Sequence, residues 1–382
     1  MAGIYIHIPF CKQACYYCNF HFSTNISGKD EMINAICHEA IDRKNYIQET
    51  VETIYFGGGT PSLIGFDALK KIFEILHLHF LIAPNAEITL EANPDDISIQ
   101  SLVQWKSLGM NRLSIGIQSF FEEHLKWMNR SHSAQQAERC IQLALDAGYE
   151  NFSIDLIYGI PGLSNKQWEE NIDQAITFLV PHISCYALTV EPKTALHTMI
   201  AQHKKDDVDE AVQSNHFNIL QQKMKKAFYR QYEISNFAIK GFESRHNSGY
   251  WQEKTYLGIG PSAHSYNGES RQWNISNNAL YVKNVRESLP YFDIEYLTET
   301  QKLNEYLMTH LRIAKGIDIE KIKLLSGEKT ALKICNAAQK WIDAGKLSYQ
   351  NENFCLTDKG KFFADGIAAD LFQEEPKESD KN

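Results

Sequence analysis

Short apolar runs alternate with amphipathic stretches along the first half of the chain. The runs predict six strands, at residues 4–9, 53–56, 87–91, 112–118, 152–158 and 183–190. The stretches between them predict helices that include residues 67–80, 97–107, 134–147 and 166–179. Because strands that alternate with helices favour parallel pairing with right-handed crossovers, we predict an α/β fold with a partial (β/α)6 barrel.

The pattern changes after residue 190. Residues 191–297 are expected to supply a polar linker, a long charged helix and a loop around His264 that packs back over the site. Residues 298–372 predict helices, a hairpin and a last helix, which together indicate a small winged-helix-like domain. The polar tail, residues 373–382, is expected to be disordered.

Composition limits the classes of protein that the chain can belong to. A formal net charge of −9 over 382 residues argues against nucleic acid as a partner. We expect no integral membrane segment and a cytoplasmic location, because there is no long uncharged apolar run and the chain opens directly into a strand. Five of the eight cysteines are scattered through apolar or helical surroundings, and we interpret them as structural: Cys37, Cys140, Cys185, Cys335 and Cys355.

The other three cysteines, Cys11, Cys15 and Cys18, follow the first predicted strand with the spacing C-x3-C-x2-C. Three thiolates on one short loop can hold a [4Fe-4S] cluster and leave one iron open to a small chelating molecule. A zinc site lacking its fourth ligand and three small buried apolar residues are the alternatives.

Further polar or glycine positions close the other predicted strands. Gly57–Thr60 follow the second strand, Glu91 and Gln118 end the third and fourth, and Asp155 lies in the fifth. In a parallel barrel these strand ends meet at one face, so the pattern indicates a single site. Taken singly, the glycines could form only a tight turn, Glu91 a solvated strand end and Gln118 a satisfied core amide.

The sequences of these motifs resemble those of the HemN/HemW family of the radical S-adenosylmethionine (SAM) superfamily. The matching segments, in order along the chain, are YIHIPFC, YFGGGTPS, ITLEANP, LSIGIQSF, NRSH and DLIYGIPG. The resemblance implies a TIM-like radical SAM barrel, a [4Fe-4S] cluster on the three cysteines, and SAM bound at the open iron. Carried over residue by residue, it places SAM against Tyr5, Gly58, Gly59, Thr60, Glu91, Gln118, Arg130 and Asp155.

Taken by itself, the segment HNSGYW, residues 246–251, is best interpreted as an ordinary aromatic turn. It resembles the H-N-x-x-Y-W element of the heme-chaperone branch of the family, which implies heme as a cofactor and His246 as its axial ligand. Imidazole is a common axial ligand of heme iron. The partners implied are heme and an acceptor protein, with respiratory proteins as one class of acceptor.

Two functions share this scaffold: a heme carrier, and an oxygen-independent coproporphyrinogen III oxidase that decarboxylates its substrate by radical chemistry. The oxidases carry a further cysteine two residues after the third ligand, where this chain has Phe20. They also carry an N-terminal extension, whereas YIHIPFC here begins at Tyr5. With the HNSGYW segment, these features favour a heme carrier without oxidase activity.

Overall fold

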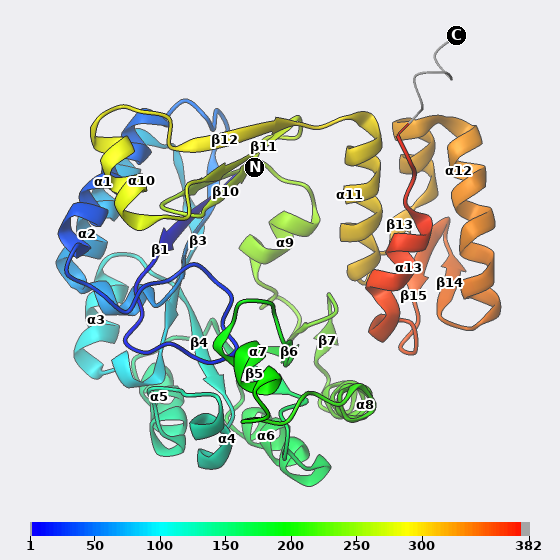
Figure 1. Ribbon diagram of the computed structural model, residues 1–382, viewed down its shortest axis with the longest axis horizontal. Coiled ribbons are helices and arrows are strands. Elements are labelled where there is room, and N and C mark those ends of the chain that lie inside the picture. The colour runs from blue at the N-terminus through cyan, green and yellow to red at the C-terminus, as the bar shows by residue number, and fades with distance from the viewer. Residues whose placement is uncertain (1, 376–382) are drawn as a thin grey trace.

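The computed structural model describes residues 2–375, and its main body is built on one twelve-stranded sheet (Figure 1). The six central strands are all parallel and follow one another in chain order. They are β1 (Ala2–Ile8), β2 (Val51–Gly58), β3 (Ile82–Ala92), β4 (Arg112–Gln118), β5 (Phe152–Tyr158) and β6 (His182–Ala187). The predicted α/β fold with parallel strands is confirmed.

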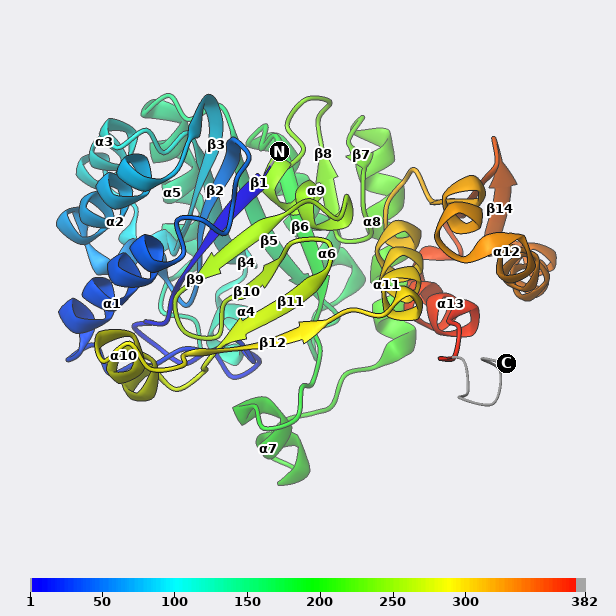
Figure 2. The ribbon, with the colours of Figure 1, turned by 90° about the horizontal axis from the view of Figure 1, so that it is seen from above.

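Helices connect these strands and cover the outside of the sheet (Figures 1 and 2). They are α1 (Lys29–Asp42), α2 (Phe66–His79), α3 (Ile99–Ser107), α4 (Glu122–Trp127), α5 (Ala134–Asp146) and α6 (Asn165–Thr177). Serine capping boxes begin α3, α5 and α6, at Ser98, Ser133 and Ser164. Each box satisfies backbone N–H groups that a helix start would otherwise leave unpaired.

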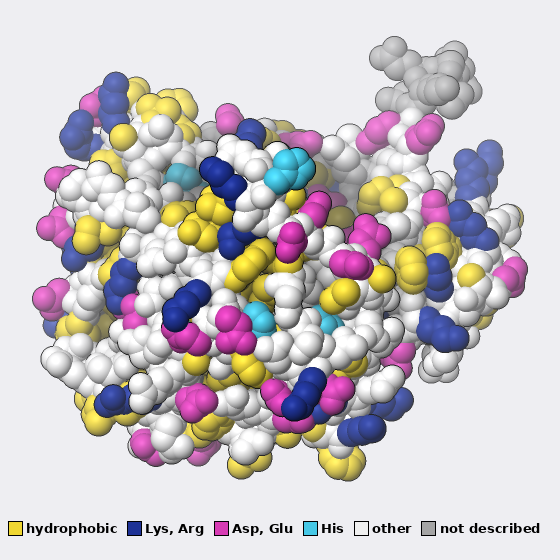
Figure 3. All heavy atoms as spheres, turned by 60° about the horizontal axis from the view of Figure 1, so that its bottom comes forward, with side chains coloured by type: hydrophobic (Ala, Val, Ile, Leu, Met, Phe, Trp, Pro, Cys, Tyr) yellow, Lys and Arg dark blue, Asp and Glu magenta, His cyan; other side chains and the backbone are white. Residues whose placement is uncertain are grey.

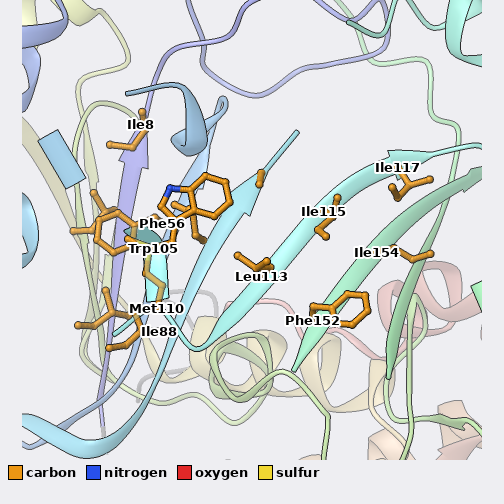
Figure 4. Packing of buried hydrophobic residues seen from close by; sticks show 14 of the residues in the cluster. Ile8, Phe56, Ile88, Trp105, Met110, Leu113, Ile115, Ile117, Phe152 and Ile154 are labelled. Atoms are coloured by element: carbon orange, nitrogen blue, oxygen red, sulfur yellow. The ribbon is translucent and has the colours of Figure 1, made fainter. Parts of the chain in front are cut away.

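Side chains alternate between the two faces of the central strands. In β4, Leu113, Ile115 and Ile117 belong to the apolar core between sheet and helices, together with Phe152 and Ile154 of β5 (Figure 4). The intervening residues, Ser114, Gly116 and Gln118, line a cavity on the inner face. Because successive strand residues point to opposite faces, one face supplies the core and the other a polar interior.

The sheet extends beyond the six predicted strands at both edges. Helices α7 (Ala195–Ala201) and α8 (Glu210–Lys226) lead to β7 (Arg230–Gln231) and β8 (Asn236–Ala238), and β8 pairs with β6. After α9 (Arg245–Trp251), the chain returns to the opposite edge, where β9 pairs in parallel with β1. The added elements there are β9 (Tyr256–Ile259), β10 (His264–Tyr266), β11 (Ser270–Asn274), α10 (Asn278–Arg286) and β12 (Phe292–Tyr296).

The expectation of a loop around His264 that covers the site is therefore wrong. Gly258 and His264 lie in paired strands, and a Cβ at Gly258 would come 2.1 Å from the carbonyl oxygen of His264. The glycine allows β9 and β10 to approach this closely, so the glycine-rich stretch makes a tight hairpin.

Residues beyond β12 form a compact module beside the barrel (Figure 1). It has its own apolar core, which includes Leu303, Leu307, Ile334 and Leu371. The module consists of α11 (Glu299–Arg312), β13 (Ile317–Asp318), α12 (Ile319–Asp343), β14 (Leu347–Gln350), β15 (Asn353–Leu356) and α13 (Ala364–Leu371). Helix α12 kinks at Gly327, whose φ of 79° is not helical. A three-stranded sheet beside three helices matches the predicted winged-helix-like arrangement.

Most of the tail that is expected to be disordered, residues 376–382, lies outside the described residues. Between residues 2 and 375, none of the helices has the length and apolar character needed to cross a membrane.

Candidate cluster and cofactor site

A cavity of about 590 Å³ opens at the carboxyl ends of the central strands. Its lining includes the three clustered cysteines and all but one of the residues predicted to contact SAM: Cys11, Cys15, Cys18, Gly58, Gly59, Thr60, Glu91, Gln118, Arg130 and Asp155. These residues come from β2 to β5, from the loops that follow β1 and β2, and from the segment between α4 and α5. Strand-end geometry thus brings together residues that are far apart in the sequence.

The cysteine loop is held against the glycine segment that follows β2. The backbone N–H of Gly59 donates to the carbonyl of Ile8 at 2.8 Å, and that of Thr60 donates to the carbonyl of Phe10 at 2.7 Å. A Cβ at Gly59 would lie only 2.6 Å from the Phe10 oxygen. Glycine is needed here for the close approach of two backbones, in addition to any contact with a ligand.

The other side of the loop is tied to the segment after α4. The side-chain amide of Gln13 donates to Asn129 Oδ1 at 2.8 Å, and that of Asn129 donates to the Ala14 carbonyl at 2.8 Å. Lys12 also forms ion pairs with Asp95 and Asp96. Sequence reasoning missed these anchors, although Asn129 is part of the NRSH motif.

The thiols line the cavity wall without meeting at one point. Across residues 2–375, no three His, Cys, Asp or Glu side chains are gathered closely enough to hold a single metal ion. Burial raises the pKa of the Cys11 thiol, and it raises that of the Cys18 thiol to about 11.

Arg130 is enclosed by acceptors in the cavity wall. Its guanidinium donates to Cys15 Sγ at 3.3 Å, to Asn93 Oδ1 at 2.8 Å and to the Gly116 carbonyl at 2.9 Å. Although burial alone lowers the pKa of Arg130, Tyr17 and Cys15 raise it overall. The side chain is therefore a fixed cation beside the cysteine loop.

Two carboxyl groups face the cavity from neighbouring levels of the barrel. Burial raises the pKa of Glu91 to about 7 and that of Asp155 to about 6. Glu91 accepts hydrogen bonds from the Tyr55 hydroxyl at 2.7 Å and from the Gly58 N–H at 3.2 Å. Carboxylates that are poorly solvated and have few donors can gain from a ligand that brings positive charge or hydroxyl groups.

Tyr5 does not line this cavity. Its hydroxyl lies 3.2 Å from His7 Nδ1, and its ring stacks against those of Tyr55 and His246 in the barrel interior. In the register of β1 and β2, Tyr5 pairs with Tyr55, one step below the level of His7 and Gly57.

His246 lies deeper still and does not line the large cavity. It borders a second pocket of about 290 Å³ near the amino ends of β1 and β2. The residue is 3% exposed, and its ring has Nδ1 2.8 Å from Thr53 Oγ1 and Nε2 2.8 Å from the Tyr250 hydroxyl. Burial lowers the pKa of His246 to about 3, so its ring is neutral.

The start of α9 fixes the position of His246. Ser244 caps the helix by accepting from the Asn247 N–H, and Glu87 of β3 accepts from the backbone N–H groups of Arg245 and His246. A carboxylate at a helix N-terminus stabilises the unpaired N–H groups there. Sequence reasoning did not find Glu87, because the residues around it do not indicate a contact with a helix 159 residues further along the chain.

The outer part of the large cavity reaches the C-terminal module. Phe217 of α8 and residues Arg312, Lys361, Phe362 and Asp365 of the module line it. None of these was expected at the site, because the sequence does not show how the module docks.

On the face drawn in Figure 3, basic and acidic side chains are interspersed.

Comparisons with known proteins agree with this architecture. Residues 5–175 match the family model of the radical SAM superfamily, and residues 297–363 match that of the HemN C-terminal domain. The solved structure of coproporphyrinogen III oxidase (HemN) from Escherichia coli, a radical SAM enzyme, superposes with a TM-score of 0.82 at 21% identity, covering 97% of this chain and 90% of that one. The match to the family model places residues 5–175 in the radical SAM superfamily, and the fold agrees with that assignment.

Relatives named heme chaperone HemW show which family within the superfamily the chain is similar to. The protein from Bacillus subtilis (strain 168) is 31% identical over 376 residues, which are 96% of this chain and 98% of the relative. The protein from Escherichia coli (strain K12) is 37% identical over 267 residues, 69% of each chain. The chain belongs to the HemW family.

Proposed function

We propose that this protein is a heme chaperone that carries a [4Fe-4S] cluster and SAM, binds heme and passes it to an acceptor protein. The observation that carries the proposal is the similarity to HemW relatives over nearly the whole chain. The cavity with three free thiols and the separately buried His246 agree with it.

The cysteine loop fits a cluster. Cys11, Cys15 and Cys18 all line one cavity, and none of them forms a disulfide. A cube of four irons holds its thiolates on separate corners, which agrees with thiols that do not converge on one point. When bound, such a cluster offers one open iron for the amino and carboxylate groups of SAM.

The rest of the inner cavity fits SAM. Gly58 and Gly59 expose backbone beside the thiols, and Glu91 and Asp155 can accept hydrogen bonds from ribose hydroxyls or an ammonium group. Arg130 is already hydrogen-bonded to Asn93 and Gly116. We therefore assign it to orienting the Cys15 side of the loop as well as to contact with the SAM carboxylate.

His246 fits an axial ligand of heme. Its ring is neutral, so a lone pair is available without loss of a proton once a hydrogen-bond partner leaves. In the tautomer that carries the proton on Nδ1, Thr53 Oγ1 accepts a hydrogen bond from that N–H, and Nε2 accepts one from the Tyr250 hydroxyl. A hydrogen bond to the other ring nitrogen is the usual way in which a protein orients a ligating histidine.

An anaerobic hemin titration of the reconstituted protein, followed by absorbance, tests the proposal. We expect saturable binding near one heme per chain and much weaker binding by His246→Ala. His203→Ala, which changes an exposed histidine, is the matched control. Absence of saturable binding, together with decarboxylation of coproporphyrinogen III, would identify an oxidase instead.

A further inference from the structure

Strand β12 forms one end of the twelve-stranded sheet, and within residues 2–375 no further strand pairs with its outer edge (Figures 1 and 2). All five of its residues are exposed. The strand at the opposite end, β7, has only two residues, and the C-terminal module contacts it through a hydrogen bond of 2.7 Å from Lys361 Nζ to Gln231 Oε1. Short or covered edges resist pairing with another chain, and β12 is neither short nor covered.

The backbone of β12 has hydrogen-bonding groups that face outward. Two hydrogen bonds of 2.9 Å bracket its ladder with β11, one accepted by the Tyr291 carbonyl and one donated by the Leu297 N–H. Antiparallel partners exchange such bonds at every second residue. The N–H and C=O groups of Phe292, Ile294 and Tyr296 therefore point away from β11, at the positions where a further strand would bind.

The side chains of β12 alternate between apolar and acidic. Phe292, Ile294 and Tyr296 share one face of the strand and are 36%, 44% and 74% exposed. Asp293 and Glu295 lie on the other face. Single exposed apolar residues are ordinary, but three in one row on a sheet edge form a surface that a second strand can cover.

We propose that β12 is a docking edge, at which an extended segment of a partner protein adds one strand to the sheet. The segment alternates apolar and basic side chains, so that its basic residues lie opposite Asp293 and Glu295. Cross-strand pairs of opposite charge stabilise a sheet, and the net charge of −9 also favours a basic partner. This surface goes beyond the proposed function and does not depend on heme.

A second copy of the chain is a poorer occupant of the docking edge. Antiparallel pairing of two β12 strands about Ile294 sets Asp293 of each copy opposite Glu295 of the other. A shift of the register by two residues sets one of these acids opposite its own copy. Like charges directly opposite each other destabilise a sheet. The two acids therefore disfavour self-association and favour a basic segment.

Labelled peptides test the docking edge by fluorescence anisotropy with the full-length protein. The probe has about seven residues, in which valine alternates with lysine. One control peptide alternates valine with glutamate, and another has the composition of the probe with its lysines grouped together. We expect saturable binding of the probe and about tenfold weaker binding, or less, of both controls.

Two substitutions at one position test the outward backbone. Ile294→Pro removes an outward N–H and leaves the ladder with β11 intact, because proline is tolerated where an edge N–H faces solvent. Ile294→Val keeps that N–H and is the matched control. We expect the proline variant to bind the probe about tenfold more weakly and the valine variant to bind it as the wild type does.

A charge exchange tests the acids, also in the event that the proline variant does not fold. Asp293→Lys combined with Glu295→Lys should transfer the preference from the probe to the glutamate peptide. Failure of that transfer, equal binding by the proline and valine variants, or a wild type without saturable probe binding would each overturn the docking edge.

Analytical ultracentrifugation tests the alternative occupant. Self-association of the wild type that Ile294→Pro abolishes would assign the edge to a second copy and overturn the proposal. We expect the wild type and the variant to sediment alike. None of these results bears on hemin binding, which tests the proposed function separately.

Discussion

The phenol ring of Tyr55 stacks on the imidazole of His246, with centroids 5.0 Å apart and planes inclined by 22°. The hydroxyl of the same tyrosine donates to Glu91 at 2.7 Å. One buried side chain therefore contacts both the candidate heme ligand and a carboxylate of the candidate SAM site. Its ring contacts His246 and its hydroxyl contacts Glu91. Two substitutions can therefore test the two contacts separately.

Tyr55→Phe keeps the ring and removes the hydroxyl, whereas Tyr55→Leu removes the ring as well. We expect Tyr55→Phe to retain hemin affinity and Tyr55→Leu to weaken it by up to about tenfold, because a stacked aromatic pair contributes about 0.5–1.5 kcal/mol. Hemin titrations of both variants measure the difference. Equal affinities in the two variants would show that stacking does not orient His246.

The affinity for SAM should depend on pH. The pKa values of Glu91 and Asp155 are raised to about 7 and about 6, so each carboxyl group takes up a proton as the pH falls through its value. A ligand that binds the ionised forms must then displace these protons. We expect the affinity to be highest above pH 7, to weaken through about 7 and to weaken again through about 6.

Isothermal titration calorimetry with SAM across this pH range checks the expectation. Glu91→Gln cannot ionise, so it should bind SAM more weakly above pH 7 and lack the upper of the two steps. An affinity that stays constant from pH 8 to pH 5, about the range in which these groups titrate, would exclude both carboxylates from the contact.

Local pattern was enough to predict the central fold. The apolar positions of β4 and β5 recur with a period of two, and the residues between them are small or polar except Ile157, so strand type and bounds followed directly. The common placement of Glu91, Gln118 and Asp155 around one cavity followed from the rule that parallel strands end at one face.

Contacts between distant segments could not be predicted in the same way. The pairing of β9 with β1 joins residues 3–6 to residues 256–259, and the glycines of that segment favour a loop when seen alone. The position of His246 depends on Glu87, which lies 159 residues earlier. No local periodicity reports such a contact, so the sequence indicated the histidine but not the end of the barrel that it faces.

Cys15→Ala should abolish the cluster. A cube cannot be held firmly by the two remaining thiolates, so we expect loss of the brown absorbance and of most of the iron after anaerobic reconstitution. Cys140→Ala is the matched control, because Cys140 is buried in α5 and is not part of the cavity wall. Normal iron content in Cys15→Ala would contradict the assignment of the loop.

Glu39→Ala should destabilise the barrel edge. The buried carboxylate accepts from the Gly260 N–H at 2.8 Å and from the Asn274 amide at 2.7 Å, and it pairs with Arg43, so it links α1 to the β9–β11 region. Its removal leaves the buried Arg43 without its carboxylate partner, which costs about 3–5 kcal/mol of unfolding free energy. Glu31→Ala, an exposed site on the same helix, should change it by less than about 0.5 kcal/mol in urea denaturation.

Gly59→Ala should displace the cysteine loop while leaving all three thiols in the chain. Its Cβ would lie 2.6 Å from the Phe10 carbonyl oxygen and 2.9 Å from that of Ile8, and both neighbours are backbone atoms. Overpacking of this kind costs about 1–3 kcal/mol, and the loop is the part that can move. We therefore expect a lower iron content and faster loss of the cluster to a chelator. Gly366→Ala in α13 meets no atom within 4 Å, so it should keep the full cluster and stabilise the fold by up to about 1 kcal/mol. Full cluster occupancy in Gly59→Ala would mean that the contacts of the loop with other segments, such as those to Asn129 and Arg130, are enough to position it.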